Sequence, residues 1–430
     1  MKTIHLLCVL SLGLAWLPAG SRALQLEKFT AADLPPVAAS AVPAPGRSTS
    51  PKEWTVLIYV SARNDLCLDA IKDVNEMEAA GSTDRVNVVA ELGRIACEPF
   101  FNPFTGVTEP LPPQADWTGS RRFLIRKDSD ALTITSPVLQ HFPDADMGDW
   151  KHLAEFITWG KASFPAKNYL LVVGGHGAGW RGVKPTANKG ISYDEPSKNH
   201  ISPSELARAI KAGGGVNVYA SDACLMQTFE VVYELRDSAE YVVGSQESTP
   251  AGGYNYAAFL RALAEDPGDA LAASQAIMRS FAGFYGAQKK SVTMSILRPA
   301  MAAELAVRLD RFARLVSVSP ADRKLYHSKK YALRSFDDES ARDLYQVAAL
   351  YSENTATPEV KEAAKDITSF LSGKFIAGNA AVGYKSKGAN GVSVYFPLSS
   401  FDYKQKYESL SFSRDTFWDE MLRAVMAERN

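Results

Sequence analysis

Short apolar runs alternate with amphipathic stretches along the first half of this chain. The runs from Trp54 to Val60, Val86 to Leu92, Tyr169 to Val173 and Val216 to Ala220 are rich in β-branched residues and poor in charge. Runs of this length and composition are typical of strands that are buried on both faces of a parallel sheet. The pattern predicts a mostly parallel central sheet.

The stretches between these runs predict helices. Leu68, Ile71, Val74 and Met77 recur at helical spacing until Gly81 ends the pattern. Further helices are expected around 153–157 and over 204–211 and 229–235, and further strands over 122–126 and 241–244. Strands that alternate with helices in this way indicate an α/β fold, a three-layer α/β/α sandwich with helices on both faces of the sheet.

The pattern becomes mostly helical beyond about residue 265. Helices are expected over 271–284, 302–316 and 341–351, with strands over 291–297 and 391–396. We assign residues 53–265 to the α/β domain and residues 266–430 to a smaller, mostly helical C-terminal accessory domain. Residues 98–118 hold five prolines and are expected to form a surface loop.

The N-terminus reads as an export signal. Lys2 is followed by an apolar stretch from Leu6 to Leu17 and by a small-x-small cleavage site at Ser21-Arg22-Ala23. We expect residues 1–23 to be removed and residues 24–52, which are rich in Pro, Ala and Ser, to form a flexible linker. The mature protein would then be secreted, periplasmic or on the cell surface, without a membrane span; a retained anchor is the alternative.

Charge and composition narrow the class of partner. The 430 residues include 47 basic and 48 acidic side chains, so the net charge of −1 offers no general attraction for nucleic acid or an anionic membrane. Hydrophobic residues make up 46% and charged residues 22%, which is ordinary for a soluble globular protein.

The chain has four cysteines, of which Cys8 falls in the expected signal peptide. Cys67 and Cys97 flank a predicted helix and the strand after it, so they are the natural disulfide pair, closing a loop of about 30 residues. Cys224 then remains as the free thiol. The alternative is that all three are reduced and buried.

His176 and Cys224 carry the strongest chemical signal. Each follows a predicted buried strand, and the carboxyl ends of such strands form the edge where α/β proteins bind ligands. An imidazole and a thiol at one edge are the machinery of a cysteine hydrolase, in which backbone amides such as those of Gly177 and Cys224 stabilise the oxyanion. We also expect Cys224 to begin a helix, whose dipole favours the thiolate.

Other readings of these residues exist. Gly175-x-Gly177-x-Gly179 follows a strand as a dinucleotide-binding loop does, but the third glycine is misplaced and no helix begins after it. His176 could equally be a structural histidine, and Cys224 an ordinary buried cysteine.

Asp222 stands two residues before Cys224, so its side chain is expected on the same face of the strand. A buried carboxylate at a reactive edge predicts a pocket that accepts an arginine or lysine side chain. The alternative role is to cap or orient local backbone.

Metal-binding patterns are missing from the sequence. It contains neither Cys-x-x-Cys nor His-Glu-x-x-His, and Asp144-x-Asp146-x-x-Asp149 does not match the spacing of an EF-hand. We therefore expect no metal and no cofactor.

Several segments resemble the clostripain family of cysteine peptidases, of the same clan as caspases, gingipains and legumains. The resemblance spans about Trp54 to Tyr256. It is carried by Trp54-Thr-Val-Leu-Ile-Tyr-Val, Asp73-Val-Asn-Glu-Met77, Met147-Gly-Asp149, His176-Gly-Ala-Gly-Trp180, Tyr193-Asp-Glu195, Ser204-Glu-Leu206, Asp222-Ala-Cys-Leu-Met226 and Ser245-Gln-Glu247. It implies a caspase-like fold, a His176 and Cys224 dyad without an obligatory third member, and Asp222 at the base of the specificity pocket.

Family resemblance also implies self-cleavage in the loop between His176 and Cys224. That interval offers Arg181, Lys184, Lys189 and Lys198, of which Lys189 is favoured because it precedes Gly190 in a small, polar stretch. Calcium dependence occurs in some relatives, but no residues here oblige it.

The sequence therefore predicts an exported cysteine endopeptidase that cleaves proteins or peptides after Arg or Lys through a thioester, made as a zymogen. The alternatives are a catalytically silent surface binding protein on the same fold and a transpeptidase, since an amine can resolve a thioester as water does.

Overall fold

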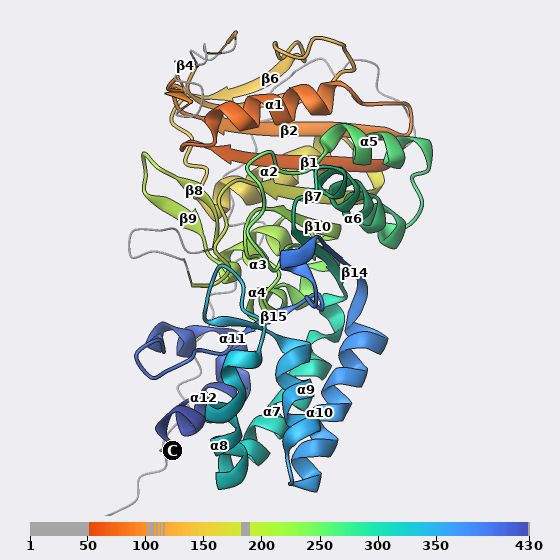
Figure 1. The fold of residues 1–430 in the computed structure, drawn as a ribbon. Coiled ribbons are helices and arrows are strands. Elements are labelled where there is room, and N and C mark those ends of the chain that lie inside the picture. The colour runs from red at the N-terminus through yellow and green to blue at the C-terminus, as the bar shows by residue number, and fades with distance from the viewer. Residues whose placement is uncertain are drawn as a thin grey trace, which may run out of the picture.

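The computed structural model describes residues 51–99, 101–102, 107–108, 111, 113–114, 117–181 and 190–428. A nine-stranded sheet crosses it in the order β14-β12-β11-β10-β7-β1-β2-β5-β6 (Figure 1). Its strands are β1 (Lys52–Ala62), β2 (Val86–Arg94), β5 (Gly119–Leu124), β6 (Val138–Phe142), β7 (Ala166–Gly174), β10 (Val216–Asp222), β11 (Ala239–Gly244), β12 (Val292–Leu297) and β14 (Ile376–Val382). The expected signal peptide and nearly all of the expected linker lie outside the described residues.

The five central strands, β2, β1, β7, β10 and β11, are parallel. The four outer strands, β5 and β6 on one side and β12 and β14 on the other, are antiparallel. The expectation of a mostly parallel sheet is confirmed, and the strand predicted over 122–126 is the antiparallel β5.

Helices cover both faces of the sheet. α1 (Cys67–Glu78), α5 (Tyr256–Glu265) and α6 (Ala270–Ala287) share a buried core with Val56 and Ile58 of β1. α2 (Trp150–Ser163), α3 (Pro203–Ala212) and α4 (Phe229–Glu234) share another core with the alternating neighbours Leu57 and Tyr59. The three-layer α/β/α sandwich is therefore confirmed.

The C-terminal part is mostly helical, but the boundary predicted at residue 265 is wrong. α6, β12 and β14 all follow that residue and extend the sandwich. The later helices are α7 (Ala302–Val318), α8 (Pro320–Lys329), α9 (Leu344–Asn354), α10 (Pro358–Phe370), α11 (Ser411–Asp415) and α12 (Trp418–Ala427). They gather beyond the β14 side of the sheet (Figure 1), and Leu305 and Phe312 of α7 belong to the same core as Phe229 of α4. Because one core is shared, these helices are not a separately packed domain.

Short strands complete the described chain: β3 (Phe101–Asn102) with β4 (Val107–Thr108), β8 (Ile191–Asp194) with β9 (Asn199–Ile201), and β13 (Ala341–Asp343) with β15 (Ser393–Tyr395). β13 corrects the helix expected from residue 341. α9 begins only at Leu344 because Asp343 caps it, its side chain accepting a hydrogen bond from the Gln346 N–H.

Cys67 and Cys97, the predicted pair, are joined by a disulfide with their Cα atoms 5.8 Å apart, and Cys224 is free. Within the described ranges, no helix has both the length and the apolar character needed to cross a bilayer.

Candidate active site

Two neighbouring strands bring His176 and Cys224 to one edge of the sheet. β7 and β10 pair in parallel with Asp222 opposite Gly174, so the residues that follow both strands leave the sheet together. His176, Cys224 and Asp222 line one cavity of about 170 Å³. The structure thus brings together the three residues on which the sequence prediction depends.

Cys224 does not begin a helix, which corrects one expectation. The backbone turns after it, with Leu225 at a φ of 61°, and α4 starts at Phe229 with Thr228 as its N-cap. The dipole of α4 acts mainly on groups within its own first turn, so it does not bear on the thiol.

The thiol of Cys224 is held by the segment that follows β11. The backbone N–H of Thr249 donates to Cys224 Sγ over 3.3 Å, and Thr249 Oγ1 lies 3.6 Å from the same sulfur. The Thr249 carbonyl oxygen lies 3.8 Å from the sulfur as an acceptor for the thiol. Thr249 therefore positions the thiol.

Gly177 packs directly against the backbone of Cys224. A Cβ at residue 177 would lie 2.6 Å from the Cys224 carbonyl oxygen and 3.0 Å from its nitrogen, closer than real Cβ contacts allow. Only glycine permits this approach, which brings the backbone of the loop after His176 beside Cys224.

The imidazole of His176 has an acidic neighbour. Its Nε2 lies 2.6 Å from Asp65 Oδ1, a residue from the loop after β1, and the His176 side chain is 36% exposed. With Nε2 engaged, Nδ1 is the ring nitrogen left to exchange a proton with a neighbouring group.

Asp222 forms a buried floor of the cavity with one oxygen engaged and one free. Oδ2 accepts hydrogen bonds from the Tyr254 N–H at 3.0 Å and the Tyr256 hydroxyl at 2.9 Å. Oδ1 is buried without a partner among the described residues. Burial raises the pKa of Asp222 to about 6.

Gly253 closes the cavity beside this carboxylate. Its φ is +50°, and a Cβ there would lie 2.6 Å from Asp222 Oδ2. A side chain at residue 253 would therefore press on the floor of the cavity.

Two further carboxylates from α1, Asp69 and Asp73, line the same cavity. Burial, and then the charge of Asp222, raise the pKa of Asp73 well above its usual range. Among the described lining residues, His176 is the one side chain that can carry a positive charge. The cavity is therefore suited to a cationic side chain.

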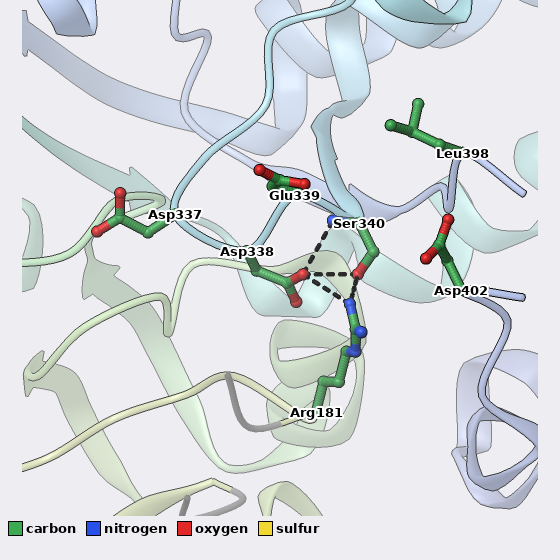
Figure 2. Close-up of a pocket in the computed structure, with 7 residues that line it drawn as sticks. All are labelled: Arg181, Asp337, Asp338, Glu339, Ser340, Leu398 and Asp402. Carbon is green, nitrogen blue, oxygen red and sulfur yellow. Dashed lines mark hydrogen bonds and ion pairs between the residues drawn. The ribbon is translucent and has the colours of Figure 1, made fainter. Parts of the chain in front are cut away.

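The predicted self-cleavage residues differ in their environments. Lys184 and Lys189 lie outside the described residues. Lys198 is exposed in the turn between β8 and β9. Arg181 is held: its Nη1 donates to Asp338 Oδ1 at 2.8 Å and to the Ser340 hydroxyl, at one side of an acidic cavity of about 310 Å³ (Figure 2).

The aspartates weighed as a calcium site perform local structural roles. Asp149 caps α2 by accepting from the Lys151 N–H, and Asp146 accepts from the Gly148 N–H, Ser197 and Asn199. Over the part of the chain that the structure describes, no group of three or more His, Cys, Asp or Glu side chains is arranged to hold a metal ion.

The C-terminal part supports both loops of the site. Trp180, four residues after His176, packs edge-on against Tyr395 and Tyr407 with ring centroids 4.8 and 5.0 Å apart. Leu225, next to Cys224, is buried with Phe336. These contacts hold both loops against the C-terminal part.

Sequence reasoning missed Asp65, Asp73 and Thr249. A signal existed for the first, because Asp65 follows the carboxyl end of a predicted strand, as His176 does. Asp73 begins one of the segments that carry the family resemblance and lies one helical turn after Asp69, on the same face of the helix, but the sequence does not say what that face meets.

Comparisons with known proteins agree with this geometry. The model of the clostripain family matches residues 58–424, which include the helical C-terminal part. Clostripain from Hathewaya histolytica is 26% identical over 225 residues, covering 47% of this chain and 40% of that protein. The chain thus matches less than half the length of this relative.

Solved structures share the fold. A secreted C11 cysteine protease from Bacteroides thetaiotaomicron, in complex with an irreversible peptide inhibitor, matches with a TM-score of 0.63 and 18% identity, over 87% of this chain and 99% of that one. An inactive zymogen C11 protease from Parabacteroides distasonis matches with a TM-score of 0.61 and 19% identity, over 85% and 99% of the two chains. The expected caspase-like fold is confirmed.

Proposed function

The chain belongs to the clostripain family of cysteine peptidases, and from that premise we propose that it is an endopeptidase that cuts after arginine or lysine, with His176 and Cys224 as the catalytic pair. One observation carries the proposal: a single cavity is lined by a thiol, an imidazole and a buried carboxylate with a free oxygen. The first two supply the chemistry, and the third recognises a cationic side chain.

The proposed reaction proceeds through a thioester. His176 accepts the thiol proton, and the Cys224 sulfur attacks the carbonyl carbon of the substrate to give a tetrahedral intermediate. The intermediate collapses as the C–N bond breaks, and the leaving amine takes the proton from His176. A water molecule, deprotonated by His176, then hydrolyses the thioester and restores the free thiol.

The backbone amides of Gly177 and Cys224 are our candidates for the oxyanion hole. The close contact between these two residues supports this choice, because a Cβ at residue 177 would lie only 3.0 Å from the Cys224 nitrogen. Donors fixed in advance around a developing negative charge typically contribute a large part of the rate enhancement.

Export and self-activation complete the proposal. The signal-like N-terminus supports a site of action outside the cytoplasm. Within the interval between His176 and Cys224, exposed Lys198 satisfies the requirement for an accessible basic residue, whereas Arg181 would have to leave Asp338 and Ser340 before it could enter an active site. Lys189 and Lys184 remain proposed sites on sequence grounds. One structural relative is described as an inactive zymogen, a property that we extend to this chain only as a proposal.

A peptide panel tests the function. Purified residues 24–430 are expected to release a fluorophore from peptides with Arg or Lys before the cut bond at least about 100-fold faster than from peptides with Asp or Leu there, because one desolvated ion pair can contribute several kcal/mol. A gel run in parallel is expected to show self-cleavage fragments ending in a basic residue. Since the thiol and imidazole need no metal, a chelator should leave the rate unchanged. Equal cleavage of all four peptides would contradict the basic specificity, and no cleavage would favour a binding role.

Asp65 is expected to act as a positioning residue for His176. Replacing it with asparagine keeps the shape and removes the charge, so the His176 imidazolium that forms during catalysis loses its counterion. Because Asp65 is largely exposed, we expect a moderate effect: about 5- to 20-fold lower kcat with KM little changed. Asp84→Asn, the same change of charge at an exposed residue away from the cavity, serves as the control. An Asp65→Asn enzyme with normal kcat would show that the contact has no part in catalysis.

A further inference from the structure

We propose that Asp73 is a second acceptor in the specificity pocket and that it selects a guanidinium over an ammonium. The inference deepens the proposed function and rests on it, because it concerns the same cavity. It follows from what Asp222 can and cannot offer a ligand, from the position of Asp73 on α1, and from the charge balance of the cavity wall.

Asp222 has one oxygen available for a substrate. Oδ2 already accepts from the Tyr254 N–H and the Tyr256 hydroxyl, and the buried Oδ1 has no partner among the described residues. Asp222 can therefore make one strong contact, but it cannot offer two free oxygens for the parallel bonds that an arginine and a carboxylate commonly form. A guanidinium in this pocket needs another acceptor.

Asp73 is placed to be that acceptor. It is half-buried on the face of α1 that lines the cavity with Asp222, and Asp222 is the neighbouring charge that acts most strongly on it. The two carboxylates come from different layers of the fold, one from α1 and one from the end of β10. A ligand that enters the cavity can meet both.

The nearby acidic groups on α1 each have one oxygen engaged. Asp69 pairs with Lys72 at 3.2 Å, and Glu76 accepts from the Tyr256 N–H at 3.2 Å. Lys72 is largely exposed and lies beside Asp69, on the solvent side of the helix. Asp73 and the free oxygen of Asp222 are thus the acceptors in the cavity wall with the least competition for a ligand cation.

The shape of the substrate's cationic group then decides whether the pocket prefers arginine or lysine. An ammonium is a compact charge that a single free oxygen and water can satisfy, whereas a guanidinium presents five N–H donors in a rigid fork. Two carboxylates that approach from different sides match the fork better than they match the point charge. Losing Asp73 should therefore harm arginine substrates more than lysine substrates.

The thermal stability of the free enzyme gives a second readout. Two neighbouring carboxylates without a counterion repel each other, which helps to raise their pKa values, so the free enzyme loses stability as the pH rises above the ordinary carboxyl range. A purely structural aspartate would behave in the opposite way, because its removal would lower stability. The direction of the change in Tm at pH 8 separates the two roles.

The experiment compares kcat/KM for two peptides that differ only in Arg or Lys before the cut bond, using wild type, Asp73→Asn, Asp222→Asn and the exposed control Asp84→Asn. We expect Asp73→Asn to lower kcat/KM about 10- to 100-fold for the Arg peptide but less than about fivefold for the Lys peptide, as for one lost hydrogen bond to a charged group. Its Tm at pH 8 should equal or exceed that of wild type. Asp84→Asn should change each value less than about twofold.

Two results would overturn the inference alone. One is an unchanged Arg-to-Lys ratio in Asp73→Asn while Asp222→Asn loses both activities. The other is a lower Tm with equal losses on both peptides, which would make Asp73 structural. A wild-type enzyme that cuts after neither residue would instead refute the proposed function itself.

Discussion

Replacing Cys224 with alanine is expected to lower kcat for peptide hydrolysis at least about 10⁴-fold. Without the sulfur no thioester can form, and removal of a nucleophile from a catalytic unit of this kind typically costs a factor of 10⁴ to 10⁶. The fold should be unaffected, since the side chain is half-buried and its loss removes one sulfur atom. Burst kinetics and turnover of an Arg peptide, measured against wild type, check the prediction.

Chemical labelling provides an independent test of the same residue. Cys67 and Cys97 are joined, so Cys224 is the free thiol among the described residues. Iodoacetamide is expected to inactivate wild type with one label per chain, located by peptide mapping at Cys224. A basic peptide should protect against labelling because it fills the adjoining cavity. Full turnover by Cys224→Ala, or a fully labelled yet active wild type, would remove Cys224 from the mechanism.

The core of the site could be predicted from the sequence for a simple physical reason. Apolar β-branched runs such as Val216 to Ala220 identify strands buried on both faces, and parallel strands in such a sheet end at a common edge. Once β7 and β10 are neighbours, His176 and Cys224 must lie close together. The observed register, with Asp222 opposite Gly174, confirms this step of the argument.

Features that depend on contacts between distant segments could not be predicted in the same way. β14 has the sequence Ile-Ala-Gly-Asn-Ala-Ala-Val, which is too poor in large apolar residues to identify an edge strand by its pattern. Asp73 lines the same cavity as Asp222, and Asp65 contacts His176, only through the packing of α1 and the β1 loop. Charged residues in an amphipathic helix usually face solvent, so their sequence pattern alone gives no reason to place them in a cavity.

The turn after Cys224 shows why the helix expectation failed. Thr228 is a good N-cap and is followed by the apolar face of α4, so the helix starts there rather than at the cysteine. The four residues before it form an irregular turn in which the Leu225 N–H donates to the Glu247 carbonyl and Leu225 packs under Phe336. Cys224 thus sits on a turn that the C-terminal part holds in place, and the family match, which continues to residue 424, includes that part.

Asp222→Asn is expected to lower kcat/KM for Arg and Lys peptides about 10²- to 10⁴-fold. The change keeps the hydrogen bonds to Tyr254 and Tyr256 within reach and removes the negative charge that a desolvated cation needs. Peptides with neutral residues before the cut bond should lose much less. Asp84→Asn, an equal change of charge on the surface, provides the control. Retained selectivity for basic peptides in Asp222→Asn would mean that another group recognises the cation.

The pH dependence of kcat/KM should also depend on the charge of Asp222, because the pKa of this carboxyl is raised to about 6. The carboxyl is neutral below this value, so wild-type kcat/KM for an Arg peptide should rise roughly tenfold from pH 5 to 7. Other titratable groups also face this carboxyl: Asp73 and Glu76 from α1, Tyr254, Tyr256 and His176. The part of the rise in kcat/KM that is present in wild type and absent from Asp222→Asn is therefore the part due to Asp222.

Stability should change with pH in the opposite direction. A carboxyl whose pKa is higher in the folded chain than in the unfolded chain contributes stability at low pH and loses it as pH rises through the folded value. The free enzyme should therefore lose roughly 3 kcal/mol between about pH 4 and pH 7 from this group, a loss that Asp222→Asn abolishes. A variant that is more stable than wild type at pH 8 and yet unable to cut after arginine would show that the pocket maintains a destabilising charge which the side chain of the substrate neutralises.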